Sequence, residues 1–297
     1  MVSTAPLLTS DAPLATANLV RGTATSTGAF ATVAFAPLLC GFSIGILDAN
    51  IGGVLENSAF TRRYASPDDT TLQLLAATMQ VGCVIGSICA GWAADTLGRR
   101  TSTLIAMLCV AASAVVLALP AAAPGGSLIP IFGGRLLSGI GNGLVCTVVP
   151  LHSSEMANAD IRGAINASFE LAIAAGILAA YLINWAVADV WDLWVVSLAA
   201  PLPTALLFLG VAASRLPESP RFLVMRGRRD EAAALLAGTL RTPRHNVAEE
   251  MAAMVASREE DEARGPVRCA ELGGRGVRKH VVVALVVLTM QVGTDEY

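Results

Sequence analysis

Six long apolar stretches, separated by short polar connections, fill the chain between residues 30 and 213. A helix needs about 20 mostly apolar residues to cross about 30 Å of hydrocarbon, and each stretch reaches that length. The predicted spans are residues 30–55, 72–94, 101–122, 128–151, 164–187 and 193–213. A seventh apolar stretch begins near His280 and is interrupted at Tyr297. We therefore expect a polytopic membrane protein whose seventh helix is truncated, as if the chain were half of something larger.

The pattern predicts an all-α membrane protein with four regions. Residues 1–29 form a disordered cytosolic tail, 30–214 a six-helix transmembrane bundle, 215–279 an intracellular helical segment, and 280–297 the start of transmembrane helix seven.

The polar segment 215–279 predicts three short amphipathic helices rather than a linker, because a pure linker would not keep an apolar stripe. Cap residues and glycines give their limits. The helices begin at the caps Ser219, Asp230 and Asn246 and end at Gly227, at Gly238 and at about Ala263.

Composition supports the membrane assignment. Hydrophobic residues make up 54% and charged residues 14% of the chain, whereas soluble domains carry about 25% charged residues. Mean hydropathy is +0.62. A net charge of −3 and the lack of a basic cluster exclude a nucleic-acid partner. The cysteines lack CxxC spacing, so we expect them to pack as small apolar residues and predict no metal site and no cofactor.

Residues 1–29 are rich in Ser, Thr and Ala and carry only Asp11 and Arg21 as charges. They lack the charged n-region of a secretory signal and have less Arg than a usual plastid transit peptide. Arginines in the connections 95–100 and 160–163 and after residue 214 predict a cytosolic N-terminus by the positive-inside rule. We favour the plasma membrane over plastid and vacuolar membranes.

Three charged residues fall inside the predicted spans, where an unpaired charge costs several kcal/mol. They are Asp48, Arg135 and Glu170. Arg135 lies about 10 Å from the outer face and Glu170 about 12 Å from the inner face at 1.5 Å per residue. We expect Glu170 or water, rather than Ser43, to hold Arg135, whereas Asp48 is either buried or solvated at headgroup level. The alternative to a functional role is an ion pair that only holds helices together.

Glycines four residues apart predict close helix packing, at Gly82 and Gly86 in span two and at Gly139 and Gly143 in span four. The glycine-rich run 133–143 does not match a phosphate-binding loop. The chain offers no nucleophile–base–acid set and no HExxH motif, so we do not expect an enzyme.

Three motifs resemble the sugar porter branch of the major facilitator superfamily. Residues 91–100, GWAADTLGRR, match GxxxD(R/K)xGRR except for the base at Thr96. Residues 133–163 resemble that family's fourth-helix signature, and residues 217–221 read PESPR. The resemblance runs from about Pro37 to Thr294 and implies the N-terminal six-helix bundle of the major facilitator fold. Sugars in this family bind at the midplane between two bundles that rock to give alternating access.

The resemblance also implies roles for individual residues. Glu170 stands where the family has a sugar-binding Gln, and Ser43 stands where proton-coupled members have an Asp. His152 and Asp192 depart from the family's Tyr and basic residue. A cytosolic gate network is implied at Asp95, Arg99, Arg100, Glu155, Arg162, Glu218 and Arg221.

We therefore predict a sugar porter-type carrier that moves a hexose or related sugar by alternating access. The alternative is a truncated, non-transporting chain that acts as an assembly partner, or an incomplete gene model. Predicted partners are a sugar, the lipid bilayer and a second bundle or a homodimeric copy. Protons stay open as a further partner, because Ser43 favours uniport while a desolvated Glu170 near an Arg favours coupling.

Overall fold

The computed structural model describes residues 26–64, 67–122, 127–157, 159–188, 194–238, 244–264 and 283. Helices account for nearly all of these residues, and the described ranges contain no strand. In chain order the helices are α2 (Ser26–Glu56), α3 (Ser58–Arg63), α4 (Asp69–Leu97), α5 (Arg99–Ala122), α6 (Ile129–Met156), α7 (Ala159–Val187), α8 (Trp194–Ala199), α9 (Pro201–Arg215), α10 (Pro220–Met225), α11 (Arg229–Gly238) and α12 (Arg244–Arg264).

Six of these segments are long and apolar enough to cross a membrane, which confirms the six predicted spans. Span six is divided at Ala200 into α8 and α9, because Pro201 has no N–H to continue the hydrogen-bond ladder of α8. The predicted seventh helix, apart from Val283, and the tail up to residue 25 lie outside the described residues.

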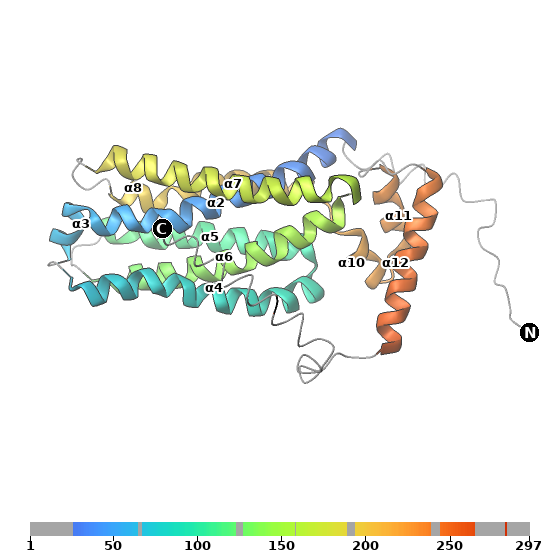
Figure 1. The fold of residues 1–297 in the computed structure, drawn as a ribbon, viewed down its shortest axis with the longest axis horizontal. Helices are drawn as coiled ribbons and strands as arrows, with labels where there is room; N and C mark the ends of the chain where they lie inside the picture. The colour runs from blue at the N-terminus through green and yellow to red at the C-terminus, as the bar shows by residue number, and fades with distance from the viewer. Residues whose placement is uncertain are drawn as a thin grey trace, which may run out of the picture. The chain divides into compact units, whose positions relative to one another are not determined.

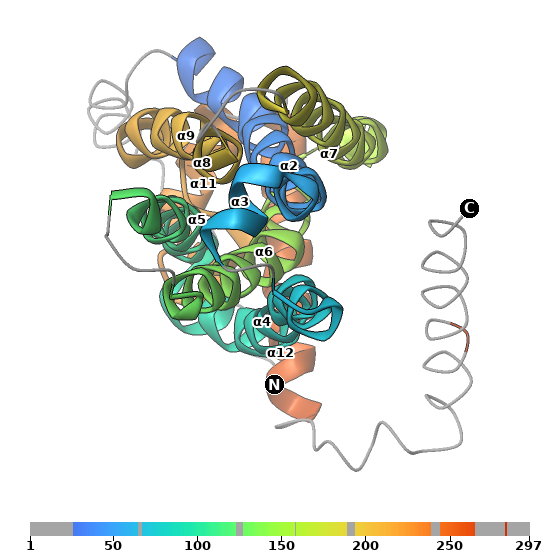
Figure 2. The ribbon, with the colours of Figure 1, turned by 90° about the vertical axis from the view of Figure 1, so that its left-hand side faces the viewer.

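The bundle is built from pairs of tightly packed helices (Figures 1 and 2). α4 packs along α6, α2 along α7, and α5 against α6, while α9 contacts both α2 and α5. The seams of two pairs are lined by glycines. A Cβ at Gly82 or Gly139 would overlap the backbone of the facing helix, and so would one at Gly45 or Gly176. The predicted close packing in spans two and four is confirmed, and the α2–α7 seam uses the same device.

The ends of the bundle differ in character. α3 lies at one end, and α10 and α11 lie at the other, which we call the α10 end (Figure 1). A buried aromatic cluster lies at the α3 end and consists of Phe60, Tyr64 and Trp194. The ring centroids of Phe60 and Trp194 are 5.3 Å apart. At the α10 end Ser219 caps α10, accepting a hydrogen bond from the Phe222 N–H, as predicted.

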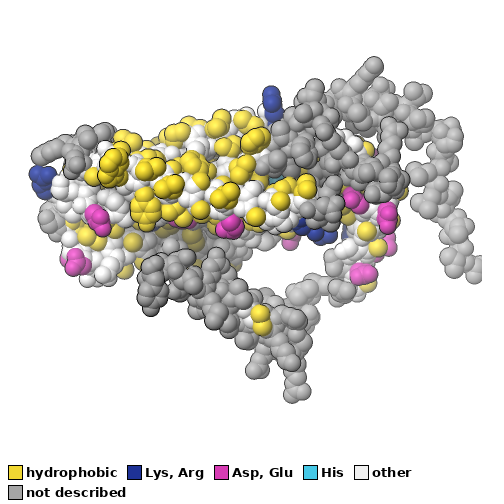
Figure 3. Space-filling model, turned by 45° about the horizontal axis from the view of Figure 1, so that its top comes forward, with side chains coloured by type: hydrophobic (Ala, Val, Ile, Leu, Met, Phe, Trp, Pro, Cys, Tyr) yellow, Lys and Arg dark blue, Asp and Glu magenta, His cyan; other side chains and the backbone are white. Residues whose placement is uncertain are grey.

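The outer surface of the bundle is apolar. Figure 3 shows hydrophobic side chains over the middle of the bundle and most charged side chains toward its ends. Ile88 on α4 and Leu171 and Trp185 on α7 are at least 70% exposed. An outer surface with large, exposed apolar side chains is suited to contact with lipid.

The polar segment forms the three predicted short helices. α11 begins at Arg229 and α12 at Arg244, so Asp230 and Asn246 lie in the first turns of these helices instead of capping them. Gly238 is the last residue of α11. α10 and α11 belong to the same compact unit as the bundle, Met1–Ala248, whereas most of α12 belongs to the unit Glu249–Tyr297. The division at residue 215 between a transmembrane bundle and an intracellular helical segment stays a prediction.

Candidate functional site

Arg135 lies inside the bundle on α6, with its side chain only 2% exposed. Its Nη1 donates a hydrogen bond to the carbonyl of Leu47 on α2, 3.4 Å away. Its Nε has no hydrogen-bond partner among the described residues. A guanidinium carries five N–H donors, so Arg135 is sparsely satisfied for a buried cation.

Asp48 on α2 is the carboxylate whose charge acts on Arg135. Within the described ranges no direct ion pair joins the two side chains. Asp48 is exposed at the bundle surface but closely surrounded by protein atoms on its other sides. Its Oδ1 accepts a 2.7 Å hydrogen bond from Nδ2 of Asn142. Asn142 follows Arg135 by seven residues, or two turns, so one side of α6 supplies both the positive charge and the neutral donor.

The contacts continue one turn further along α6. The thiol of Cys146 donates a hydrogen bond to Oδ1 of Asn142, 3.2 Å away, and Cys146 is exposed. Cys83 on α4 lies near enough to interact electrostatically with Asp48 and Arg135. We call Asp48, Arg135, Asn142 and Cys146 the polar cluster. α2 and α6 carry it, and α4 borders it.

Among the described residues the structure does not bring Glu170 into contact with Arg135, and water, the alternative partner, stays a prediction. Glu170 is exposed on α7 and makes no hydrogen bond or ion pair with Arg135 among the described residues. Its charge acts on Cys146 instead. The reason is helix packing. α7 lies along α2, where Gly176 meets Gly45, and only a small part of α7 touches α6. Glu170 therefore does not reach the guanidinium, and the carboxylate whose charge acts on Arg135 is Asp48.

Ser43 occupies a different face of α2 from Asp48, as its spacing predicted. It is fully buried, and its hydroxyl donates a 3.4 Å hydrogen bond to the carbonyl of Pro201 on α9. The expectation that Ser43 does not hold Arg135 is confirmed. The sugar-binding roles of Ser43 and Glu170 stay predictions.

A second group of charged residues meets at the α10 end. Arg99, at the start of α5, binds both carboxylate oxygens of Glu155 on α6, at 3.1 and 3.3 Å. Its Nη1 lies 3.3 Å from Asp95 and also donates to the carbonyl of Ala94 at 3.0 Å. The Arg99 side chain is 6% exposed, so this is a buried ion pair with both partners well hydrogen-bonded.

Glu218 and Ser219, which precede α10, tie this helix to the same group. Oε1 of Glu218 accepts 3.0 Å hydrogen bonds from the backbone N–H groups of Arg100 and Ser219. Glu218 thereby satisfies one of the unpaired donors at the start of α5, where a negative charge is favoured. The Ser219 hydroxyl donates to Glu155. We call Asp95, Arg99, Arg100, Glu155, Glu218 and Ser219 the ionic network.

Gly98 makes the close approach of Glu218 possible. Its φ is +94°, in the left-handed region that favours glycine, and an added Cβ would overlap Oε2 of Glu218. Phe222 covers the group, with the guanidinium carbons of Arg99 and Arg226 5.5 and 5.2 Å from its ring centre.

The observed network differs from the predicted one in its membership. Arg162 and Arg221 are exposed and make no hydrogen bond or ion pair with the other members within the described ranges. Ser219 was not predicted as a member, and neither was the covering contact of Phe222 with Arg99 and Arg226. Asn142 was missed in the polar cluster, although its two-turn spacing from Arg135 could have identified it.

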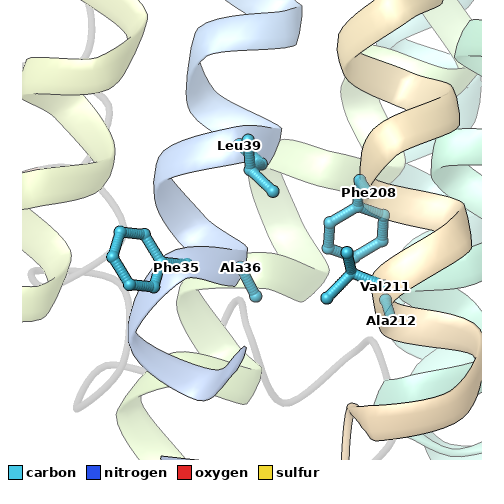
Figure 4. A pocket seen from close by; sticks show the side chains of 6 residues that line it. All are labelled: Phe35, Ala36, Leu39, Phe208, Val211 and Ala212. Carbon is cyan, nitrogen blue, oxygen red and sulfur yellow. The ribbon is translucent and has the colours of Figure 1, made fainter. Parts of the chain in front are cut away.

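Two further features of the described residues offer no groups for binding a sugar or a metal ion. A small, open hollow between α2 and α9 is lined, among the described residues, by Phe35, Ala36, Leu39, Phe208, Val211 and Ala212 (Figure 4). It offers no hydrogen-bonding side chain to a hydroxylated ligand. In the part of the chain that the structure describes, no group of three metal-binding side chains comes together.

Comparison with known proteins gives one consistent answer. Residues 29–295 match the family model described as "Sugar (and other) transporter". The chain is 36% identical over 201 residues to the probable inositol transporter 2 of Arabidopsis thaliana, covering 67% of this chain and 33% of that protein. It is 34% identical over 192 residues to the glucose transporter GlcP of Staphylococcus epidermidis, covering 64% and 41%.

Solved structures agree with the sequence matches. The fold matches the proton:xylose symporter XylE bound to 6-bromo-6-deoxy-D-glucose with a TM-score of 0.72 and 25% identity, over 79% of this chain and 54% of that one. A partially occluded inward-open form of XylE from E. coli matches with a TM-score of 0.69 and 26% identity, over 77% and 57%. The chain thus spans about half the length of the solved structures, and less of these two curated relatives.

Proposed function

The chain belongs to the sugar (and other) transporter family, and from that membership we propose that its bundle forms one wall of a carrier for a hexose or a related polyol. Transport proceeds by alternating access, without covalent chemistry. The names of its relatives, which include inositol and glucose transporters, support this substrate class.

One observation carries the proposal. Asp48 is exposed on the side of a membrane span, eight residues before its end at Glu56 and so about 12 Å from that end at 1.5 Å per residue. A carboxylate facing lipid at that depth is costly and is instead expected to face a polar cavity. The polar cluster therefore fits a water-filled path better than a lipid-facing surface.

The opposite wall of this path is a second six-helix bundle. Carriers of this kind place the substrate between two bundles related by a pseudo-twofold axis. A second bundle in the same polypeptide or a second copy of this chain would cover Asp48. In the second case the two bundles meet through the same face.

The ionic network serves a different purpose in this proposal. It joins the ends of α4, α5, α6 and α10, so these helices move as one body when the carrier rocks. We place the carrier in the plasma membrane. Its α10 end faces the cytosol, because arginines are concentrated at that end. Tags inserted before Thr4 and after Gly238 should both resist protease added outside intact cells; cleavage of either would contradict this orientation.

The test of the proposed function is uptake of radiolabelled glucose and myo-inositol into proteoliposomes, with cross-linking to detect paired bundles. Saturable uptake should appear only in preparations that contain two bundles. Saturable uptake by a chain shown to be monomeric would contradict a path shared by two walls. The absence of uptake of any sugar by paired bundles would contradict the carrier assignment.

A further inference from the structure

The apolar hollow between α2 and α9 opens on the outer surface of the bundle (Figure 4). Phe35 and Leu39 line it from α2, and Phe208 and Val211 line it from α9. Phe35 is 59% and Val211 38% exposed, so a molecule outside the bundle can reach the hollow. Its described lining carries no polar side chain. A hydrocarbon chain is the kind of group that such a lining accepts.

The hollow lies close to the membrane boundary at the α10 end. Arg215 is the last residue of the sixth membrane span. Val211 and Phe208 precede it by four and seven residues, which places them about 6 and 10 Å deeper at 1.5 Å per residue. The hollow therefore covers the depth of the first carbons of a lipid acyl chain, directly below the headgroups.

Arg215 continues the α9 side of the hollow toward the headgroup level. The spacing i, i+3, i+4 and i+7 places four α9 residues on one side of the helix: Phe208, Val211, Ala212 and Arg215. Arg215 is exposed and makes no hydrogen bond or ion pair within the described residues. Its guanidinium is thus available to a negative group that lies just above the hollow.

The negative groups of the protein near Arg215 are already engaged. The last carbonyls of a helix carry partial negative charge, which opposes an anion at the end of α9. Nη2 of Arg100 offsets part of this effect by donating a 2.6 Å hydrogen bond to the carbonyl of Ala213. Glu218, three residues after Arg215, accepts hydrogen bonds from the backbone N–H groups of Arg100 and Ser219. Among the described residues, no carboxylate pairs with Arg215.

We propose that the hollow and Arg215 together bind one anionic phospholipid. Its acyl chain lies against Phe35, Leu39 and Phe208, and its phosphate contacts the guanidinium of Arg215. A sterol would fill the hollow without using the charge, and a soluble anion would use the charge without filling the hollow. Anionic phospholipids are characteristic of the cytosolic leaflet, the side on which we place the α10 end. The proposal goes beyond sugar transport and does not depend on it.

Photo-crosslinking of the full-length chain in phosphatidylcholine nanodiscs locates the lipid. The nanodiscs contain a trace of phosphatidylglycerol or phosphatidylcholine with a diazirine in the upper part of one acyl chain, and mass spectrometry identifies the labelled peptides. We expect the phosphatidylglycerol probe to label residues 35–39 and 208–212 about five times more than the phosphatidylcholine probe. This ratio corresponds to about 1 kcal/mol for one arginine beside an anionic lipid.

The lipid-facing surface of α7 around Leu171 is the internal reference, and both probes should label it equally. Equal labelling of the hollow by the two probes would overturn the proposal, because the headgroup would then make no difference. Absence of labelling by either probe would also overturn it, since another part of the chain or a second copy would then cover the hollow.

Arg215→Gln and its matched control Arg229→Gln test the headgroup contact. Arg229 is an exposed arginine at the start of α11 and is not part of the hollow. Arg215→Gln should lower labelling by the phosphatidylglycerol probe to the level of the phosphatidylcholine probe, and Arg229→Gln should keep most of the five-fold preference. Equal losses in the two variants would assign the preference to the general positive charge of this end and overturn the site.

Val211→Phe and its matched control Val115→Phe test the acyl-chain contact. Val115 is 47% exposed on α5 and does not line the hollow. The larger side chain at position 211 fills the hollow, so Val211→Phe should reduce labelling of residues 35–39 by both probes, and Val115→Phe should not. Unchanged labelling in Val211→Phe would overturn the proposal by placing the lipid elsewhere. Thermal unfolding is recorded for each variant, and if Val211→Phe does not fold, the two arginine variants decide.

Discussion

Two buried arginines, Arg99 and Arg135, have opposite surroundings. Arg99 in the ionic network binds both oxygens of Glu155 and a backbone carbonyl. Arg135 in the polar cluster makes one 3.4 Å hydrogen bond and leaves Nε unpartnered among the described residues. A fully satisfied pair fixes the helices that it joins, whereas a sparsely satisfied cation can exchange partners at low cost. The first arrangement suits a rigid joint and the second a binding site.

The largest change in the free energy of unfolding should follow from Arg99→Ala. It leaves Glu155 buried without its guanidinium, and breaking a buried pair costs about 3–5 kcal/mol. Thermal or denaturant unfolding in detergent measures the loss. The control is Arg228→Ala, which removes an exposed pair with Glu231 and should have no measurable effect. Equal effects of the two substitutions would remove the distinction between the network and an ordinary surface pair.

Gly98→Ala should destabilise by about 3 kcal/mol, because it combines a strained left-handed alanine with displacement of Glu218. Gly227→Ala is the matched control. Gly227 has a φ of +78° and nothing within 4 Å of an added Cβ, so its cost should be about 1 kcal/mol, from backbone strain alone. Similar losses for the two would show that Glu218 is not held against Gly98.

Arg135→Leu should behave in the opposite way from Arg99→Ala. The sparsely satisfied cation is replaced by an apolar side chain, so the free energy of unfolding should stay within about 1 kcal/mol of wild type or rise. Sugar uptake by paired bundles should be lost. A destabilisation as large as that of Arg99→Ala, measured under the same conditions, would make Arg135 a structural residue.

The smallest effect is expected for Glu170→Ala. Glu170 is exposed and not paired with Arg135, so the free energy of unfolding should change by no more than about 0.5 kcal/mol. This is the opposite of the result expected if Glu170, one of the two partners predicted from the sequence, held the guanidinium. A loss of several kcal/mol in detergent would restore that expectation.

The sequence predicted the helices well because length and hydropathy determine spans, and cap chemistry determines the start of α10 at Ser219. It also identified the tight α4–α6 seam from glycine spacing. It named both Asp48 and Glu170 as charges inside the spans but did not show which of the two acts on Arg135. Counting residues gives the depth of Glu170 and Asp48 but not which neighbour each helix packs against, and that depends on contacts between distant parts of the chain.

The ionic network was predicted in part, through the family resemblance of the short motifs that carry its charged members. Ser219 was missed as a member of the ionic network, and Asn142 was missed as a member of the polar cluster. Both side chains are neutral, and a neutral side chain stands out only when its partner is known to be nearby. Arg162 and Arg221 were placed in the network by the same resemblance as the other members, but in the structure their side chains are exposed.

The central claim, that the face carrying the polar cluster borders a water-filled path for sugar, is tested most directly through Cys146. This native cysteine is exposed and hydrogen-bonded to Asn142 beside Asp48. A variant that keeps Cys146 as its only cysteine is reconstituted in bilayers as paired bundles and treated with a charged, hydrophilic thiol reagent. The account predicts that Cys146 reacts and that glucose or myo-inositol slows the reaction. Labelling by an apolar maleimide alone, unaffected by sugar, would show that this face meets lipid and would contradict the account.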